Sequence, residues 1–92
     1  MANTQFESEY ALENAEAMLD ACRQEFATAG RADAVEALNG LDVTSPASAH
    51  IALLTVQNLP ALGDMEAVKR ATVDALRSAH RQLLQRTQAR AS

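Results

Sequence analysis

The sequence has little of the residue types that form disulfide frameworks, metal centres or thick aromatic cores. Its 92 residues include one cysteine, two prolines, three glycines, three aromatic residues and no tryptophan. A single cysteine excludes an intramolecular disulfide and a cysteine-rich zinc site. So few glycines and prolines exclude a collagen-like or low-complexity chain. No apolar run approaches the roughly 18 residues that a membrane span needs.

The apolar residues that remain are small. They make up 48% of the chain, but 20 of these 44 residues are alanine, which leaves 24 larger side chains. Such a composition favours thin seams between helices over a thick globular core. A length of 92 residues fits one helical domain over residues 1–92, or one protomer of an oligomer. Area scaling predicts that the folded monomer exposes roughly 5,200 Å².

The first residues, MANTQFESEYALENA, carry no targeting pattern. They lack the basic and apolar regions of a secretory signal, and they are too acidic for a transit peptide. We therefore expect a soluble cytoplasmic protein. The alanine-rich, lysine-poor composition is typical of a GC-rich bacterial or phage gene.

Hydrophobic spacing predicts an all-α bundle, with two long helices and one short and one medium helix between them. A capping box of Thr4 and Glu7 begins a helix from Gln5 to about Ala29, and Gly30 ends it. The apolar residues of this helix share one stripe at nearly heptad spacing: Ala11, Leu12, Ala15, Met18, Leu19, Cys22, Phe26 and Ala29.

The middle of the chain predicts the two shorter helices. Residues 33–39 form a short helix that ends at Gly40. Ser45 followed by Pro46 is typical of a helix start. The stretch IALLTV that follows is too uniformly apolar for periodicity to separate helix from strand, but no second strand exists to pair with it. We therefore expect a helix that ends before Pro60.

The last helix is expected from Met65 to about Gln88, with Asp64 as its cap. Its seam comprises Met65, Val68, Thr72, Leu76, Ala79 and Leu83. Val73 and Leu84 are expected to widen one edge of this seam. Residues 1–4 and 89–92 are expected to fray.

Charge is divided unevenly along the chain. Residues 1–46 carry nine acids and two bases (−7), whereas residues 47–92 carry three acids and six bases (+3). The favoured interpretation is an acidic first helix beside a basic last helix. The alternative is a surface for an anionic partner on the last helix, with these candidate residues: Lys69, Arg70, Arg77 and Arg81. No aromatic residues lie between them to stack on bases, which counts against nucleic acid.

The first helix has a second stripe opposite its seam, and we predict that this stripe binds a partner. Its residues are Phe6, Tyr10, Ala17 and Ala21. An exposed aromatic pair at helical spacing is typical of an interface. The alternative is that the middle helix covers the stripe, which is then part of the core. Four acids on one side of the same helix predict a solvated face: Glu9, Glu13, Glu16 and Asp20.

No pattern predicts catalysis, a cofactor or a metal. Cys22 lies in a helix seam, where a free cysteine packs as a small hydrophobe. His50 and His80 have no carboxylate at ligand spacing. The three glycines stand too far apart for a phosphate loop.

Two segments, AGRADAVEAL and LGDMEAVKRA, share a local pattern around Gly30 and Gly63. Their 33-residue separation and their turn glycine are similar to tetratricopeptide repeats. The resemblance covers two turns, and Pro60 lies where that family's first helix continues. It implies stacked helix pairs that capture a peptide or helix.

These observations lead to a functional hypothesis. The chain is a small non-enzymatic helical module for protein–protein interaction, an adaptor, chaperone or inhibitor. It self-associates as a homodimer or larger homo-oligomer through apolar helix faces. The alternative is a nucleic-acid-binding regulator that uses the basic C-terminal helix.

Overall fold

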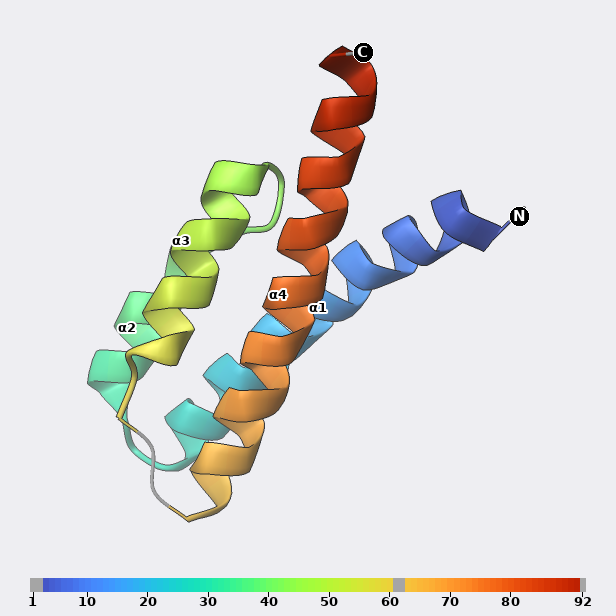
Figure 1. Cartoon of the computed structure of the whole chain (residues 1–92). Helices are drawn as coiled ribbons and strands as arrows, with labels where there is room; N and C mark the ends of the chain where they lie inside the picture. The colour runs from blue at the N-terminus through green and yellow to red at the C-terminus, as the bar shows by residue number, and fades with distance from the viewer. Residues whose placement is uncertain (1–2, 61–62, 92) are drawn as a thin grey trace.

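In the computed structural model the described residues form four helices (Figure 1). It describes residues 3–60 and 63–91, with side chains for 10–60 and 63–88. Helix α1 spans Asn3–Thr28, α2 Ala32–Asn39, α3 Pro46–Gln57 and α4 Asp64–Ala91. No strand occurs in these residues, so the predicted all-α fold and the predicted order of helix lengths are confirmed.

The helices pack in a closed circuit. Helix α4 packs against α1 on one side and α3 on the other, while α2 joins α1 to α3 (Figure 1). Among the described residues no pair of Cα atoms from α1 and α3 lies within 8 Å. The molecule is elongated, with extents of 46 × 22 × 15 Å. The circuit closes only over the length of the eight-residue α2, so the N-terminal part of α1 and the C-terminal part of α4 extend beyond it.

The core lies along the predicted seam of α1. Ala15, Leu19, Cys22 and Phe26 are buried, and Leu12 and Met18 pack against them. Ala29 was wrongly placed in this seam, because α1 ends at Thr28 and the exposed Ala29 belongs to the following turn.

The predicted seam of α4 is buried over most of its length. Leu76, Ala79 and Leu83 are buried, and Val73 widens the seam as expected. Leu84, which was expected to widen the same edge, does not, since its side chain is 39% exposed. Ala75 is buried but was not predicted.

Both turn glycines adopt left-handed backbone conformations. Gly30 has φ +77°, and the Arg31 amide donates to the Phe26 carbonyl at 2.9 Å, which confirms the predicted stop of α1. Gly63 has φ +61° and precedes α4. Asp64 is the first residue of α4 and not its cap, because the Glu66 amide donates to the Gly63 carbonyl at 3.1 Å.

The predicted start of α3 is confirmed. The Ser48 amide donates to the Ser45 side chain at 3.1 Å, and the Ser45 amide donates to the Ser48 side chain at 3.0 Å. Pro46 occupies the first turn. The helix covers residues 51–56 and ends at Gln57, ahead of Pro60.

The outer ends differ from the prediction in length. Helix α1 begins at Asn3, two residues before the expected Gln5, and α4 runs to Ala91, past the expected Gln88. The capping side chains of Thr4 and Glu7 lie outside the described side chains. Fraying of residues 1–4 and 89–92 stays a prediction.

The helix pairs around the two glycines are unequal. Helices of 26 and 8 residues flank Gly30, whereas helices of 12 and 28 residues flank Gly63. The two glycines share a left-handed backbone, but Gly30 follows the end of α1 and Gly63 directly precedes α4, and the flanking helix pairs are not equal repeats.

Candidate functional site

The predicted binding stripe of α1 lies on the outside of the molecule. Tyr10 is 65% exposed, and Ala17 and Ala21 are also exposed. The Phe6 side chain lies outside the described side chains. The alternative that the middle helix covers this stripe is wrong, because α3 packs against α4 and α2 instead. We call Tyr10, Ala17 and Ala21 the α1 outer face.

Carboxylates border the α1 outer face. Glu13, Glu16 and Asp20 are exposed on one side of it, as the helical spacing predicts, while the Glu9 side chain is not described. Asp20 pairs with Arg23 one turn along the same helix. Glu13 and Glu16 therefore place negative charge beside the small apolar side chains of the α1 outer face.

A second apolar surface, which the periodicity of no single helix predicts, lies where α3 meets α4. Ile51, Leu54 and Leu84 are 57%, 43% and 39% exposed. The rings of His50 and His80 meet across the two helices with their centroids 5.3 Å apart. These five residues form what we call the α3/α4 surface.

The histidine contact sets the register of this surface. Helices α3 and α4 run in opposite directions (Figure 1), and each histidine is followed four residues later by an exposed leucine. Four residues advance a helix by about 6 Å. Leu54 and Leu84 therefore lie on opposite sides of the histidine pair, each about one turn away.

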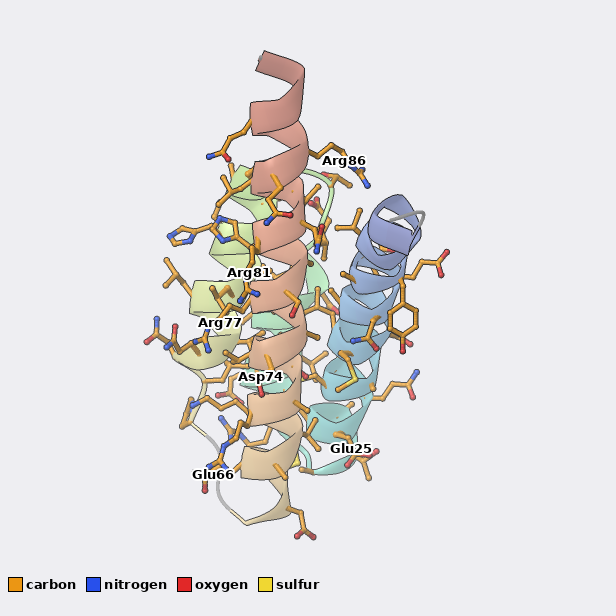
Figure 2. All side chains as sticks on the ribbon, turned by 45° about the vertical axis from the view of Figure 1, so that its right-hand side comes forward. Glu25, Glu66, Asp74, Arg77, Arg81 and Arg86 are labelled. Atoms are coloured by element: carbon orange, nitrogen blue, oxygen red, sulfur yellow. The ribbon has the colours of Figure 1, made fainter. Side chains whose placement is uncertain are left out.

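Cations border the α3/α4 surface. Lys69, Arg70 and Arg77 line a shallow open depression beside Gln57, and Arg81 follows one turn further along α4. Figure 2 shows Arg77 on the α3 side of α4 and Arg86 on the α1 side. The structure thus brings three of the four predicted anion-binding residues together and places the fourth next to them.

Two of these cations have partners within their own helix. Arg70 lies 3.4 Å from Glu66, and Arg77 lies 3.9 Å from Asp74. Helix α1 does pack along α4, as the charge division suggested, but these ion pairs do not join the two helices. The pairs are exposed and of little strength, so both arginines can still interact with an external group.

Cys22 is fully buried in the α1 seam. Burial raises the pKa of its thiol, and a hydrogen bond with Thr72 opposes this shift only in part. A protonated, inaccessible thiol is a poor nucleophile, which fits its predicted role as a packing residue.

The sequence could not reveal the histidine contact, because His50 and His80 are 30 positions apart on different helices. Only the register between α3 and α4 brings the rings together. No group of three or more His, Cys, Asp and Glu side chains suited to a metal occurs in the described part of the chain.

The chain matches no protein-family model, no curated protein and no solved structure. Within the described residues, no helix has the length and apolar character needed to cross a membrane.

Proposed function

We propose that this chain is a small non-enzymatic helical interaction protein, an adaptor, chaperone or inhibitor of a protein partner. We further propose that it self-associates by docking the α1 outer face of one copy on the α3/α4 surface of the next. The observation that carries the proposal is the exposure of three large apolar side chains, Ile51, Leu54 and Leu84, on the two helices that meet at the histidine pair. Exposed apolar side chains that gather within a polar border are typical of an interface.

Charge selects the pairing of the two surfaces. The α1 outer face is bordered by Glu13 and Glu16, and the α3/α4 surface is bordered by Arg77 and Arg81. Two α1 outer faces would place like charges against each other, which is unfavourable, whereas the unlike surfaces attract. The contact is therefore heterologous, and it closes into a ring or continues as a chain.

The fit of shapes supports the same pairing. Ala17 and Ala21 allow a close approach along α1, and Tyr10 supplies one large amphipathic ring. The α3/α4 surface offers aliphatic side chains on both sides of the histidine pair. A helix laid along this line buries apolar area in the manner of helix-in-groove recognition.

The test is a charge-reversal exchange followed by sedimentation velocity at about 10 to 500 µM, where a contact of modest area becomes populated. Glu13→Lys with Glu16→Lys, and separately Arg77→Glu with Arg81→Glu, are each expected to leave the protein monomeric. Mixing the two double variants should restore association, since each then presents the surface that the other needs. Glu36→Lys on α2 changes charge away from both surfaces and should associate like wild type.

The apolar part of the contact is tested separately. Leu54→Gln with Leu84→Gln should abolish association and keep a cooperative melt, because both side chains are exposed in the monomer. A wild type that stays monomeric over the whole concentration range overturns self-association, as does association that both reversed variants retain. Loss of the cooperative melt in the leucine variant would show that these side chains belong to the core.

Nucleic-acid binding by the basic residues of α4 is the alternative proposal. Glu66 and Asp74 lie among these cations and weaken the field that a phosphate backbone would meet. If it holds, the wild type is retained on heparin at low salt and the Arg77→Glu, Arg81→Glu variant is not. No retention of the wild type ends this alternative.

A further inference from the structure

The chain contains only two histidines, and the fold brings them together. His50 lies on α3 and His80 on α4, with ring centroids 5.3 Å apart and ring planes inclined by 39°. Neither residue is needed to fill the core, since His50 is exposed and His80 is half-buried. Core packing therefore does not account for this pair.

The separation of the rings fits shared coordination. Imidazole binds zinc with an N–Zn distance of about 2.0–2.1 Å, so two imidazoles on one tetrahedral ion have centroids about 5 Å apart. His50 is exposed, and its ring can turn about its side-chain bonds without disturbing buried residues. Neutral imidazole is a preferred ligand for Zn²⁺, Cu²⁺ and Ni²⁺.

We propose that His50 and His80 form a two-imidazole site for a divalent transition metal ion, which links α3 to α4. The remaining coordination positions face solvent and take water. The described residues offer no third protein ligand at this site. Arg77 and Arg81 are the charged groups nearest to His80 along α4, and their charge weakens binding of a cation without blocking the ligand atoms.

Binding at this site favours the folded chain. The two imidazoles meet only when α3 and α4 are packed in register, so a metal held by both binds the folded state more tightly than the unfolded one. Such a ligand raises the free energy of unfolding as its concentration exceeds its dissociation constant. The site needs one chain only and is formed in the monomer, where no second copy covers the α3/α4 surface, so its test does not require self-association.

The experiment is thermal unfolding of the full chain, followed by circular dichroism, with and without ZnCl₂ and then CuCl₂. The melting temperature of the wild type should rise by about 5 °C or more once the metal exceeds its dissociation constant about tenfold. Cu²⁺ should give the larger shift at equal concentration. His50→Asn and His80→Asn should each lose the shift while keeping the metal-free melting temperature and helicity of the wild type.

Two controls separate this site from other ligands. Cys22→Ala removes the single thiol and should keep the metal-induced shift, even though its own melting temperature is lower. Electron paramagnetic resonance of the Cu²⁺ form should show two nitrogen ligands and one copper per chain. The proposal is overturned if the wild type shows no shift, if either histidine variant keeps the full shift, or if the shift depends on Cys22.

Discussion

For Thr72, the sequence predicts the position in the seam but not the contacts of the side chain. It is the only fully buried polar residue among the described side chains. Its hydroxyl donates to the Val68 carbonyl at 2.8 Å and lies 3.4 Å from the Met18 carbonyl of α1. Helical spacing placed Thr72 in the seam, but only the packing of α1 on α4 brings the hydroxyl near a second helix.

Two substitutions measure how much the Thr72 hydroxyl contributes to the free energy of unfolding. Both carbonyls already accept a helical amide, so Thr72→Val leaves only the weakly polar Cys22 thiol without its hydrogen bond and should stay within about 1 kcal/mol of wild type. Thr72→Ala removes buried volume and should lower the free energy of unfolding by about 1–2 kcal/mol. Urea unfolding compares the two. If Thr72→Val costs well over about 1 kcal/mol, the bond from the hydroxyl to the Met18 carbonyl is a main link between the helices.

At the scale of elements, local patterns determined the helices but not their relative positions. Gly30, Ser45 and Pro46 carry their signals within a few residues, so the ends of α1 and α3 were predictable. The exposure of Leu84 was not, because it depends on where α3 begins. With His50 opposite His80, the start of α3 at Pro46 lies near the level of Leu84, and little helix remains to cover it.

The same dependence on register explains what was missed at the candidate site. A helical wheel of α1 shows that Tyr10, Ala17 and Ala21 share a side, and they do. The α3/α4 surface is made of residues from two helices, so no single wheel contains it. Its exposed leucines and paired histidines follow from the antiparallel packing of α3 on α4.

The turn after α1 gives a matched test of backbone conformation. A Cβ added at Gly30 or at Gly40 would meet no atom within 4 Å, so an alanine at either position clashes with no neighbouring residue. Gly30 has φ +77° and Gly40 has φ −95°. Gly30→Ala should destabilise by about 1 kcal/mol, while Gly40→Ala should be neutral or stabilise by up to about 1 kcal/mol. Equal melting temperatures for the two variants would contradict the assigned turn.

At the scale of the whole molecule, the fold leaves more surface exposed than its mass requires. The accessible surface is 5916 Å², against the roughly 5,200 Å² expected for a compact chain of this length. The short α2 closes the helix circuit over part of the length only, and the ends of α1 and α4 stay uncovered on several sides. This surplus is consistent with the proposed association between copies.

The side chain of Arg31 links the turn between α1 and α2 to the connection between α3 and α4. The Arg31 guanidinium lies over the Phe26 ring at 5.5 Å, donates to the Asp33 carboxylate and donates to the Pro60 carbonyl at 3.1 Å. It therefore connects the α1–α2 turn with the segment that follows α3. The hydrogen bond from Arg31 is the main cause that lowers the pKa of Asp33.

This contact predicts that the stability of the fold decreases at low pH. The pKa of Asp33 is lowered in the folded chain, and hydrogen bonds from Ser48 and Thr44 likewise lower the pKa of Asp42. A carboxyl whose folded pKa lies below its unfolded value, about 3.9, stabilises the fold fully above that value, and the contribution is lost as the pH falls through the folded pKa. The melting temperature should therefore drop below about pH 4.

Substitution of both carboxylates isolates their share of this acid loss. Asp33→Asn with Asp42→Asn should melt at a lower temperature than wild type at pH 7, and the difference should shrink as the pH falls below about 4 and the wild-type carboxyls take up protons. Glu36→Gln removes an exposed carboxylate of α2 and should follow the wild-type profile. Thermal melts at closely spaced pH values measure all three proteins. If the melting temperatures of the double variant and of wild type differ by the same amount at every pH, the hydrogen bonds to Asp33 and Asp42 do not stabilise the fold in the way the structure indicates.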